Sequence, residues 1–281
     1  MEMRDTPRLF GGIVSEASVH PGHLLVPGAA GSGTILHVPH SSRTIPPDVR
    51  QGILLGDDEL AYELALMTDA HTELIAERAA SAALSPPWMF VNRMSRLVVD
   101  PERFTDESEV MRQAGMGPVY TRTAAGKRLR AEDDAAELAL LQAWFHPYAR
   151  AMTDLVDERL AATGRVTIID VHSYPSHRLP YEIGAQRRPA ICLGTHPFHT
   201  PGRLLAAALE VFAACGDVDE NTPFDGCYVP VNHFGTDARV SALMVEIRRD
   251  IYMAEPGGPP TDGMTTVVGS LTALIDALAR T

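Results

Sequence analysis

Residues 34–43, TILHVPHSSR, form a short apolar run that passes directly into a polar loop. Apolar runs of this length, bounded by turn-forming residues, are typical of buried strands. The loop contains a histidine, His40, close to the point where such a strand ends. In open α/β sheets, ligands bind beyond the carboxyl ends of the strands. A histidine at this position is therefore well placed for catalysis or metal binding.

Two later stretches have the same form. Residues 165–173, RVTIIDVHS, lead from an apolar run to Asp170 and His172. Residues 241–247, SALMVEI, are apolar except for Glu246 near their end. A helical pattern precedes the first of these runs, and this αβ alternation is typical of a parallel or mixed sheet. We expect the three strand ends to meet around a metal ion.

All 281 residues are predicted to form one α/β domain with a mixed, mostly parallel sheet flanked by helices. Residues 1–33 indicate an irregular lead-in with one edge strand, and residues 104–130 indicate an excursion from the sheet. Apolar residues at spacings of three and four predict long helices over residues 57–83 and 132–162. Pro147 should kink or divide the second helix.

Composition limits the classes of partner. The chain has 24 basic and 36 acidic residues, a formal net charge of -12, which argues against nucleic acid and anionic membranes. It has no signal-peptide pattern and no apolar run near the ~20 residues that span a bilayer. Cys192, Cys215 and Cys227 show no CxxC spacing and suggest free thiols. We expect a cytoplasmic protein, and the oligomeric state stays open.

The polar residues at the strand ends form a candidate metal site. A catalytic zinc typically has three protein ligands and one open position for water. His40 and His172 supply two ligands, and Asp170 shares a strand face with His172 and can orient its imidazole. The third ligand is expected in the first long helix, from Asp69 or His71. Helical periodicity places His71 on the inward stripe and therefore favours it.

Glu246 is the one carboxylate in an apolar run. A buried carboxylate is costly unless it is paired or coordinated. It either forms a structural ion pair with Arg248 or Arg249, or acts as the general base for a metal-activated water. The residues alone leave both roles open.

Three arginines lie close together in residues 92–103, NRMSRLVVDPER. Arg93, Arg96 and Arg103 can clamp the carboxylate of a substrate, because guanidinium groups bind carboxylates bidentately. Alternatively, they form a solvated or salt-bridged surface with the acidic residues of the same stretch.

Together these segments resemble the N-formylglutamate amidohydrolase family. The matching pieces cover about residues 34–255 in family order, and they are HVPHSS at 37–42, TDAHT at 68–72, SRLVVDPER at 95–103, DVHS at 170–173, ICLGT at 191–195 and ALMVEIRRDIYM at 242–253. The resemblance places the chain with aspartoacylase-like and zinc-carboxypeptidase-like hydrolases. It implies their zinc-carboxypeptidase-like (phosphorylase/hydrolase-like) fold, a mixed α/β sheet flanked by helices.

The resemblance also implies a ligand set. His40 and His172 match zinc-binding histidines. Asp69 matches the acidic position that follows the first histidine, so it is favoured over His71. A break in the helix near Thr68 would reconcile this choice with the periodicity.

Further roles follow from the same matches. Glu246 matches the glutamate expected to activate water. Arg96 and Arg103 match arginines that bind the substrate carboxylate or polarise the scissile carbonyl, and we assign Arg96 to catalysis. The side chains that we assign to substrate binding are Arg103, Arg93, Ser41 and Tyr252.

The sequence departs from the related pattern in two places. Aspartoacylase-type proteins carry HxxE after the first strand, whereas Arg43 stands three residues after His40. Related sequences often read Asp-x-Asn-Arg, whereas residues 100–103 read DPER, so Glu102 adds a negative charge.

We expect a zinc amidohydrolase that cleaves the linear amide of a small N-acylated acidic amino acid. The default reaction converts N-formyl-L-glutamate to formate and glutamate, so the expected partner is a small-molecule carboxylate. The alternatives are a carboxypeptidase-like or other N-acyl-amino-acid deacylase, and a metal-free binding protein on the same fold.

Overall fold

A computed structural model describes residues 19–182 and 187–280. Its strands are β1 (Val19–His20), β2 (His23–Val26), β3 (Thr34–Val38), β4 (Trp88–Asn92), β5 (Val166–Tyr174), β6 (Ile191–Gly194), β7 (Val218–Glu220) and β8 (Val240–Arg248). Over the described residues they form one sheet in the order β1-β2-β4-β3-β5-β8-β6-β7. Strands β4, β3, β5 and β8 are parallel neighbours, as are β6 and β7, and the remaining pairs are antiparallel. The predicted mixed, mostly parallel sheet is confirmed.

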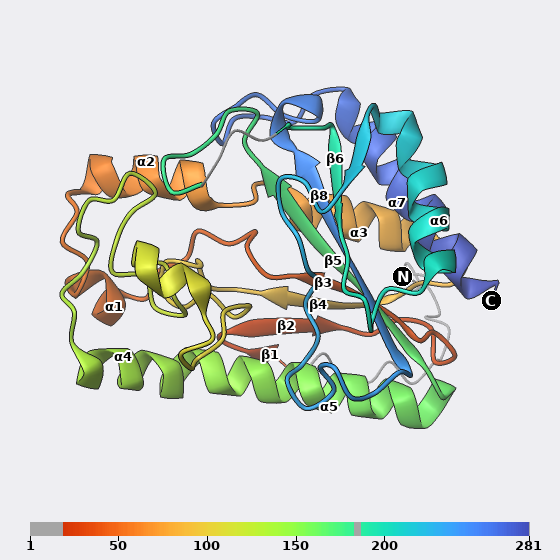
Figure 1. The fold of residues 1–281 in the computed structure, drawn as a ribbon, viewed down its shortest axis with the longest axis horizontal. Coiled ribbons are helices and arrows are strands. Elements are labelled where there is room, and N and C mark those ends of the chain that lie inside the picture. Colours follow the sequence, from red (N-terminus) through yellow and green to blue (C-terminus); the bar gives the residue numbers. More distant parts are fainter. Residues whose placement is uncertain (1–18, 183–186, 281) are drawn as a thin grey trace, which may run out of the picture.

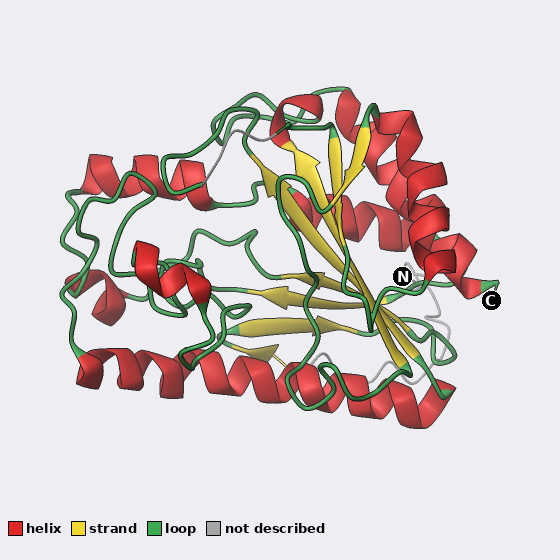
Figure 2. Cartoon of the chain, in the orientation of Figure 1, coloured by secondary structure: helices red, strands yellow, loops and turns green. Residues whose placement is uncertain are grey.

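Helices flank the sheet, as Figures 1 and 2 show. The α-helices are α1 (Pro47–Gln51), α2 (Asp57–Met67), α3 (Thr72–Ala82), α4 (Asp134–Leu140), α5 (His146–Thr163), α6 (Gly202–Phe212) and α7 (Gly263–Ala279). Short 3-10 or π turns are η1 (Val110–Ala114), η2 (Leu141–Phe145), η3 (Ala213–Cys215) and η4 (Arg249–Ile251). None of the helices in the described part of the chain is long and apolar enough to cross a membrane.

The two faces of the sheet are buried in separate apolar cores. Leu36 and Ile169 belong to the core that includes residues of α3, α6 and α7. Ile35 and Ile168 belong to the core beneath α5. Side chains of a strand alternate between faces, so Asp170, two residues after Ile168, lies on the α5 side. His172 follows by the same rule, and the polar site is therefore built on one face of the sheet.

Both long helices predicted from the sequence are interrupted. The prediction of one helix over residues 57–83 is wrong, because α2 ends at Met67 and α3 begins at Thr72. Thr68 is extended (φ -80°, ψ 133°) and ends α2, and His71 adopts the left-handed conformation (φ 68°) directly before α3. The break near Thr68 is thus present. In the second helix a π turn precedes α5, and Pro147 lies in the first turn of α5, where its missing N–H is tolerated.

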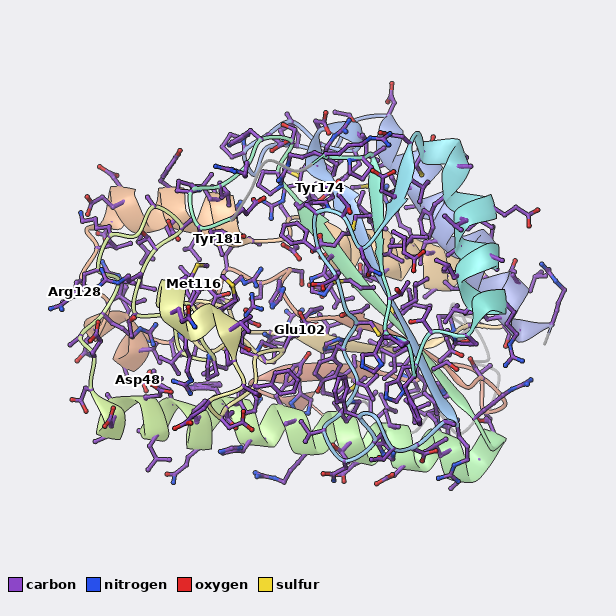
Figure 3. The ribbon with its side chains drawn as sticks, in the orientation of Figure 1. Asp48, Glu102, Met116, Arg128, Tyr174 and Tyr181 are labelled. Atoms are coloured by element: carbon purple, nitrogen blue, oxygen red, sulfur yellow. The ribbon has the colours of Figure 1, made fainter. Side chains whose placement is uncertain are left out.

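The lead-in and the excursion are only partly tested. Residues 1–18 lie outside the described residues. The strand predicted in the lead-in is β2, but its predicted place at the edge is wrong, because β2 lies between β1 and β4. Within residues 104–130, Met116 and Tyr120 are buried and pack with apolar residues of α2. Figure 3 labels Met116 in this segment. The assignment of the whole chain to one domain stays a prediction.

Candidate metal centre

Three adjacent parallel strands bring the predicted residues together. His40 follows the end of β3, His172 lies near the end of β5, and Glu246 lies near the end of β8. In the register of the sheet, His172 stands directly beside Glu246. All three side chains are buried. The carboxyl ends of these strands therefore form the floor of one site, as the open α/β arrangement predicts.

His40, Asp69 and His172 converge with metal-ligand spacing. The two imidazole Nδ1 atoms are 3.3 Å apart, and Oδ2 of Asp69 lies 3.1 Å from Nδ1 of His172 and 3.7 Å from Nδ1 of His40. Donor atoms at ~2.0–2.1 Å from a tetrahedral zinc lie roughly 3.3–3.4 Å apart. Two imidazoles and one carboxylate at these separations fit a catalytic divalent cation with an open position.

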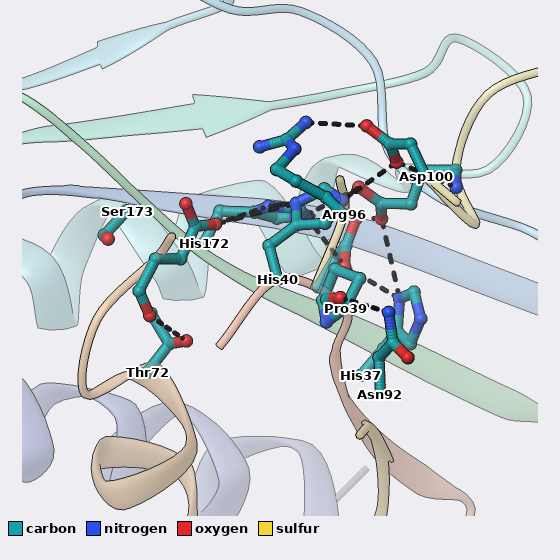
Figure 4. A network of polar contacts seen from close by, with 12 residues as sticks. His37, Pro39, His40, Thr72, Asn92, Arg96, Asp100, His172 and Ser173 are labelled. Atoms are coloured by element: carbon teal, nitrogen blue, oxygen red, sulfur yellow. Dashed lines mark hydrogen bonds and ion pairs between the residues drawn. The ribbon is translucent and has the colours of Figure 1, made fainter. Parts of the chain in front are cut away.

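Carboxylates contact the Nε2 atoms of His40 and His172, which point away from the metal cluster (Figure 4). Nε2 of His40 lies 2.9 Å from Oδ1 of Asp100. Nε2 of His172 lies 3.0 Å from Oδ1 of Asp170 and 3.2 Å from Oε2 of Glu102. A neutral imidazole that donates from Nε2 keeps its lone pair on Nδ1. These carboxylates therefore orient both rings toward a cation and raise the basicity of Nδ1.

The helix break places Asp69 in the site and His71 outside it. The backbone N–H of Asp69 donates to the carbonyl of His40 at 3.0 Å. Oδ1 of Asp69 accepts a hydrogen bond from Nη2 of Arg249 at 3.1 Å, so Oδ2 is left to face the histidines. His71 instead donates from Nε2 to the carbonyl oxygen of Gly258 at 2.8 Å. A single continuous helix could not produce this arrangement.

The electrostatics of the cluster favour a cation. Burial alone would raise the pKa of Asp69, but hydrogen bonds from His172 and His40 hold it well below its ordinary value. Burial would lower the pKa of His172, but the carboxylates of Asp170 and Glu102 raise it well above its ordinary value. The histidines thus lie in a strongly negative environment. A metal ion would replace the protons that this environment otherwise retains.

The charges at the site leave room for a divalent ion. Six carboxylates and three guanidinium groups meet here, and the difference is three negative charges; the residues are Asp69, Asp100, Glu102, Asp170, Asp225, Glu246, Arg96, Arg103 and Arg249. With neutral histidines, a divalent cation offsets most of this excess. Buried charge is costly when it is unbalanced, so the count supports the same ion as the geometry.

Glu246 faces the cavity beside the metal cluster. The cavity has a volume of ≈270 Å³, and its lining includes Glu246, His40, Asp69 and His172. Burial raises the pKa of Glu246 to about 7. Its Oε2 has no hydrogen-bond partner among the described residues. A buried carboxylate with a free oxygen and a pKa near neutrality has the properties of a general base.

Arg248 and Arg249, the two arginines considered as ion-pair partners of Glu246, pair with other carboxylates. Arg248 pairs with Asp250 at 2.7 Å. Arg249 pairs with Asp69 at 3.1 Å and also donates to the side chain of Ser173 at 3.2 Å. Both arginines therefore have partners other than Glu246.

Two of the predicted arginines line the same cavity. Nη2 of Arg96 donates to Oδ2 of Asp100 at 2.8 Å, and its Nε donates to the hydroxyl of Tyr120 at 3.1 Å. Nε of Arg103 lies 3.5 Å from Oδ2 of Asp100. Asp100 thus connects both guanidinium groups to His40. The arrangement places positive charge beside the metal cluster, where a substrate carboxylate or a developing oxyanion can be bound.

Three residues assigned to substrate binding lie outside this cavity lining. Nη1 of Arg93 pairs with Oε1 of Glu73 at 2.7 Å, and its side chain is 48% exposed. The hydroxyl of Ser41 donates to the same carboxylate at 3.5 Å. Tyr252 is fully buried, and its hydroxyl donates to the carbonyl of Ala70 at 2.7 Å. The assignment of these three residues to substrate binding stays a prediction.

Sequence reasoning missed the supports of the histidines. Asp100 was assigned only to a possible salt bridge with the arginines, and Glu102 only to a departure from a related pattern. His37, on β3, is fully buried and donates from Nδ1 to Oδ1 of Asp170 at 2.9 Å. The available signal was the position of Asp100, an acidic residue directly after the apolar run at residues 97–99.

Comparisons with known proteins identify a family and related folds. A family model described as N-formylglutamate amidohydrolase matches residues 32–253. The fold is similar to the crystal structure of an N-formylglutamate amidohydrolase from Ralstonia eutropha JMP134, with a TM-score of 0.78 and 20% identity over 93% of this chain and 98% of that one. It is also similar to a gene product from Agrobacterium tumefaciens, with a TM-score of 0.65 and 19% identity over 97% and 99% of the two chains. No curated protein matches the sequence.

Proposed function

The chain belongs to the N-formylglutamate amidohydrolase family, and we propose that it is a zinc-dependent hydrolase of the N-acyl amide of a small acidic amino acid. The default substrate is N-formyl-L-glutamate, which yields formate and glutamate. The observation that supports this most strongly is the convergence of His40, Asp69 and His172, with a 3.3 Å separation between the two Nδ1 atoms. We further propose a cytoplasmic location, which the three free cysteines fit.

Zinc fits the donor set of two imidazole nitrogens and one carboxylate oxygen. When bound, such an ion polarises a carbonyl and lowers the pKa of a water molecule. The protein residues determine how that chemistry is used. Asp100 and Asp170 fix the imidazole rings through their Nε2 atoms, and Arg249 fixes the carboxylate of Asp69. The ligand atoms are thus held in place before the substrate enters.

We assign proton transfer to Glu246. In its ionised form the carboxylate accepts a proton from the attacking water, and it then donates that proton to the leaving amine. Water adds its oxygen to the formyl carbon, the C–N bond breaks, and formate and the free amino acid result. The pKa of Glu246, raised by burial to about 7, suits both steps, because the residue takes up and releases a proton near neutral pH.

Arg96 and Arg103 bind the anionic parts of the substrate in this proposal. Both side chains line the cavity, and each also contacts Asp100. One guanidinium group holds the substrate carboxylate, and the other faces the carbonyl oxygen on which charge develops. Such charge-assisted hydrogen bonds are about twice as strong as neutral ones.

The experiment that tests the proposal is a substrate panel on purified, zinc-loaded protein. We expect formate release from N-formyl-L-glutamate, with lower kcat/KM for N-acetyl-L-glutamate and for unmodified dipeptides. Removal of the metal with a chelator should abolish the activity, and added zinc should restore it. Undiminished turnover by metal-free protein would contradict the proposal, and preference for dipeptides would instead identify a carboxypeptidase-like enzyme.

A further inference from the structure

A second cavity lies next to the metal site and has no role in the mechanism above. Its volume is ≈500 Å³, against ≈270 Å³ for the cavity at the metal cluster. We call it the aromatic cavity, because its lining includes the rings of Phe104, Phe145, Tyr228 and Phe234. It lies between the start of α5 and the segment of residues 225–234. Ligand sites in proteins are commonly apolar hollows of ~300–1,000 Å³.

The two cavities are neighbours. Four residues line both of them, and these are Glu102, Arg103, Asp225 and Met244. Met244 lies on β8 two residues before Glu246, so the same strand face serves both cavities. Glu102 contacts the imidazole of His172 from the shared wall. A ligand at the metal cluster therefore has the aromatic cavity directly beside it.

The chemistry of the aromatic cavity favours an uncharged aromatic or bulky apolar group. Phe104 and Phe234 meet edge to face with their ring centroids 6.0 Å apart, and His196 lies 4.8 Å from Phe234. Phe104 is 39% exposed, so its ring offers surface that an incoming group can cover. The charged part of the lining is mixed, because Arg103 and Arg150 stand there beside Asp154 and Asp225. An aromatic ring finds offset and edge contacts with the rings of this cavity.

Arg103 lies where the two cavities meet and sets the orientation of a ligand. Its side chain is 27% exposed, and its one close anionic contact recorded in the described residues is Asp100, at 3.5 Å from Nε. A substrate α-carboxylate bound to this guanidinium group would have its α-carbon at the junction. The N-acyl group on one side then points to the metal cluster. The amino-acid side chain on the other side points into the aromatic cavity.

We propose that the aromatic cavity is a subsite for the side chain of an N-formyl amino acid, and that N-formyl derivatives of aromatic and bulky apolar amino acids are therefore substrates in addition to the acidic ones. This inference rests on the proposed function, because it places the formyl group at the metal cluster. It predicts selectivity for large apolar side chains over small ones, through contacts made outside the metal cluster.

The test compares N-formyl-L-phenylalanine with N-formyl-L-alanine on the zinc-loaded full chain, with formate release as the readout. We expect wild-type kcat/KM for the phenylalanine derivative to exceed that for the alanine derivative at least about tenfold. Ala149→Trp on α5 fills the aromatic cavity and should lower this ratio about tenfold, mainly through KM. Ala161→Trp is the matched control, because this exposed position on the same helix lines neither cavity, and it should keep the wild-type ratio.

Equal kcat/KM values for the two substrates in the wild type, or a ratio unchanged by Ala149→Trp, would overturn the subsite. Val231→Trp fills the same cavity from a position that is 75% exposed, and it replaces Ala149→Trp if that variant does not fold. Failure of the proposed function is seen separately, as absence of formate release from every substrate, N-formyl-L-glutamate included. In that case the Kd of N-formyl-L-phenylalanine is measured by calorimetry. A Kd raised about tenfold by the cavity-filling variant supports the subsite. An equal Kd in both proteins, or no binding to the wild type, overturns it.

Discussion

The strand ends and residues 92–103 build the same site in different ways. At the strand ends, His172 and Glu246 stand side by side because the sheet register fixes them, and the apolar runs before them made their positions predictable. In residues 92–103 the sequence predicts functional arginines. The structure instead gives Asp100 the central position, because its carboxylate contacts both His40 and Arg96. Strand geometry is local and periodic, whereas the partners of a loop side chain are set by tertiary contacts. The predictions below separate the two regions.

The largest effect is expected at a strand end. Glu246→Gln keeps the size of the side chain but removes the proton acceptor, so kcat should fall by about 10²–10⁴-fold. Zinc content should stay at the wild-type level, because Glu246 is outside the ligand set. Steady-state kinetics and elemental analysis on the same sample check both points. Near wild-type kcat at full zinc occupancy would remove the role that we give to Glu246.

The same residue should also affect stability in a pH-dependent way. Burial raises the pKa of Glu246 from 4.5 to about 7, so between these values the folded protein binds more protons than the unfolded chain. The stability of the metal-free protein should therefore fall as pH rises through this window, by up to about 3 kcal/mol from this group. Glu246→Gln should remove that fall. Denaturant unfolding of the metal-free wild type and the variant at pH 5 and pH 8 measures the change in the free energy of unfolding of each. The same change in both proteins would contradict this prediction.

The next effect tests the loop. Asp100→Asn removes the charge that holds Nε2 of His40 at 2.9 Å, and zinc affinity should weaken by about 10–100-fold. Asp106→Asn is the control, because Asp106 is an exposed carboxylate nearby in the sequence. Competition with a chelator of known affinity gives both values. Equal zinc affinities of the two variants would mean that residues 92–103 position the substrate and do not support the metal ligands.

A smaller contrast separates the arginines themselves. Arg103→Ala removes a guanidinium group from the cavity lining, and KM for N-formyl-L-glutamate should rise by roughly tenfold or more. Arg93→Ala removes an exposed ion pair with Glu73, and kcat/KM should change by less than about twofold. A large effect of Arg93→Ala on KM would confirm the predicted role of Arg93 in substrate binding.

How far the sequence predicts this molecule depends on which interactions are local. The strand at residues 34–38 and the mixed sheet were predictable, since apolar runs and αβ alternation arise from burial alone. The break at Thr68 was not evident from periodicity, which placed His71 inward. The break combines the extended backbone of Thr68, the left-handed backbone of His71 and the hydrogen bond from His71 to Gly258, which is distant in the sequence. For the same reason the family resemblance, and not the helical spacing, indicates Asp69 as the third metal ligand.

The central claim is that His40, Asp69 and His172 hold one divalent cation, and its most direct test is metal content. Elemental analysis of zinc-loaded, desalted protein should give about one zinc per chain for the wild type. His172→Ala removes one of the two imidazoles and should reduce that content to a small fraction, while far-UV circular dichroism remains that of the wild type. Full zinc occupancy in folded His172→Ala, or no retained zinc in the wild type, would contradict the account.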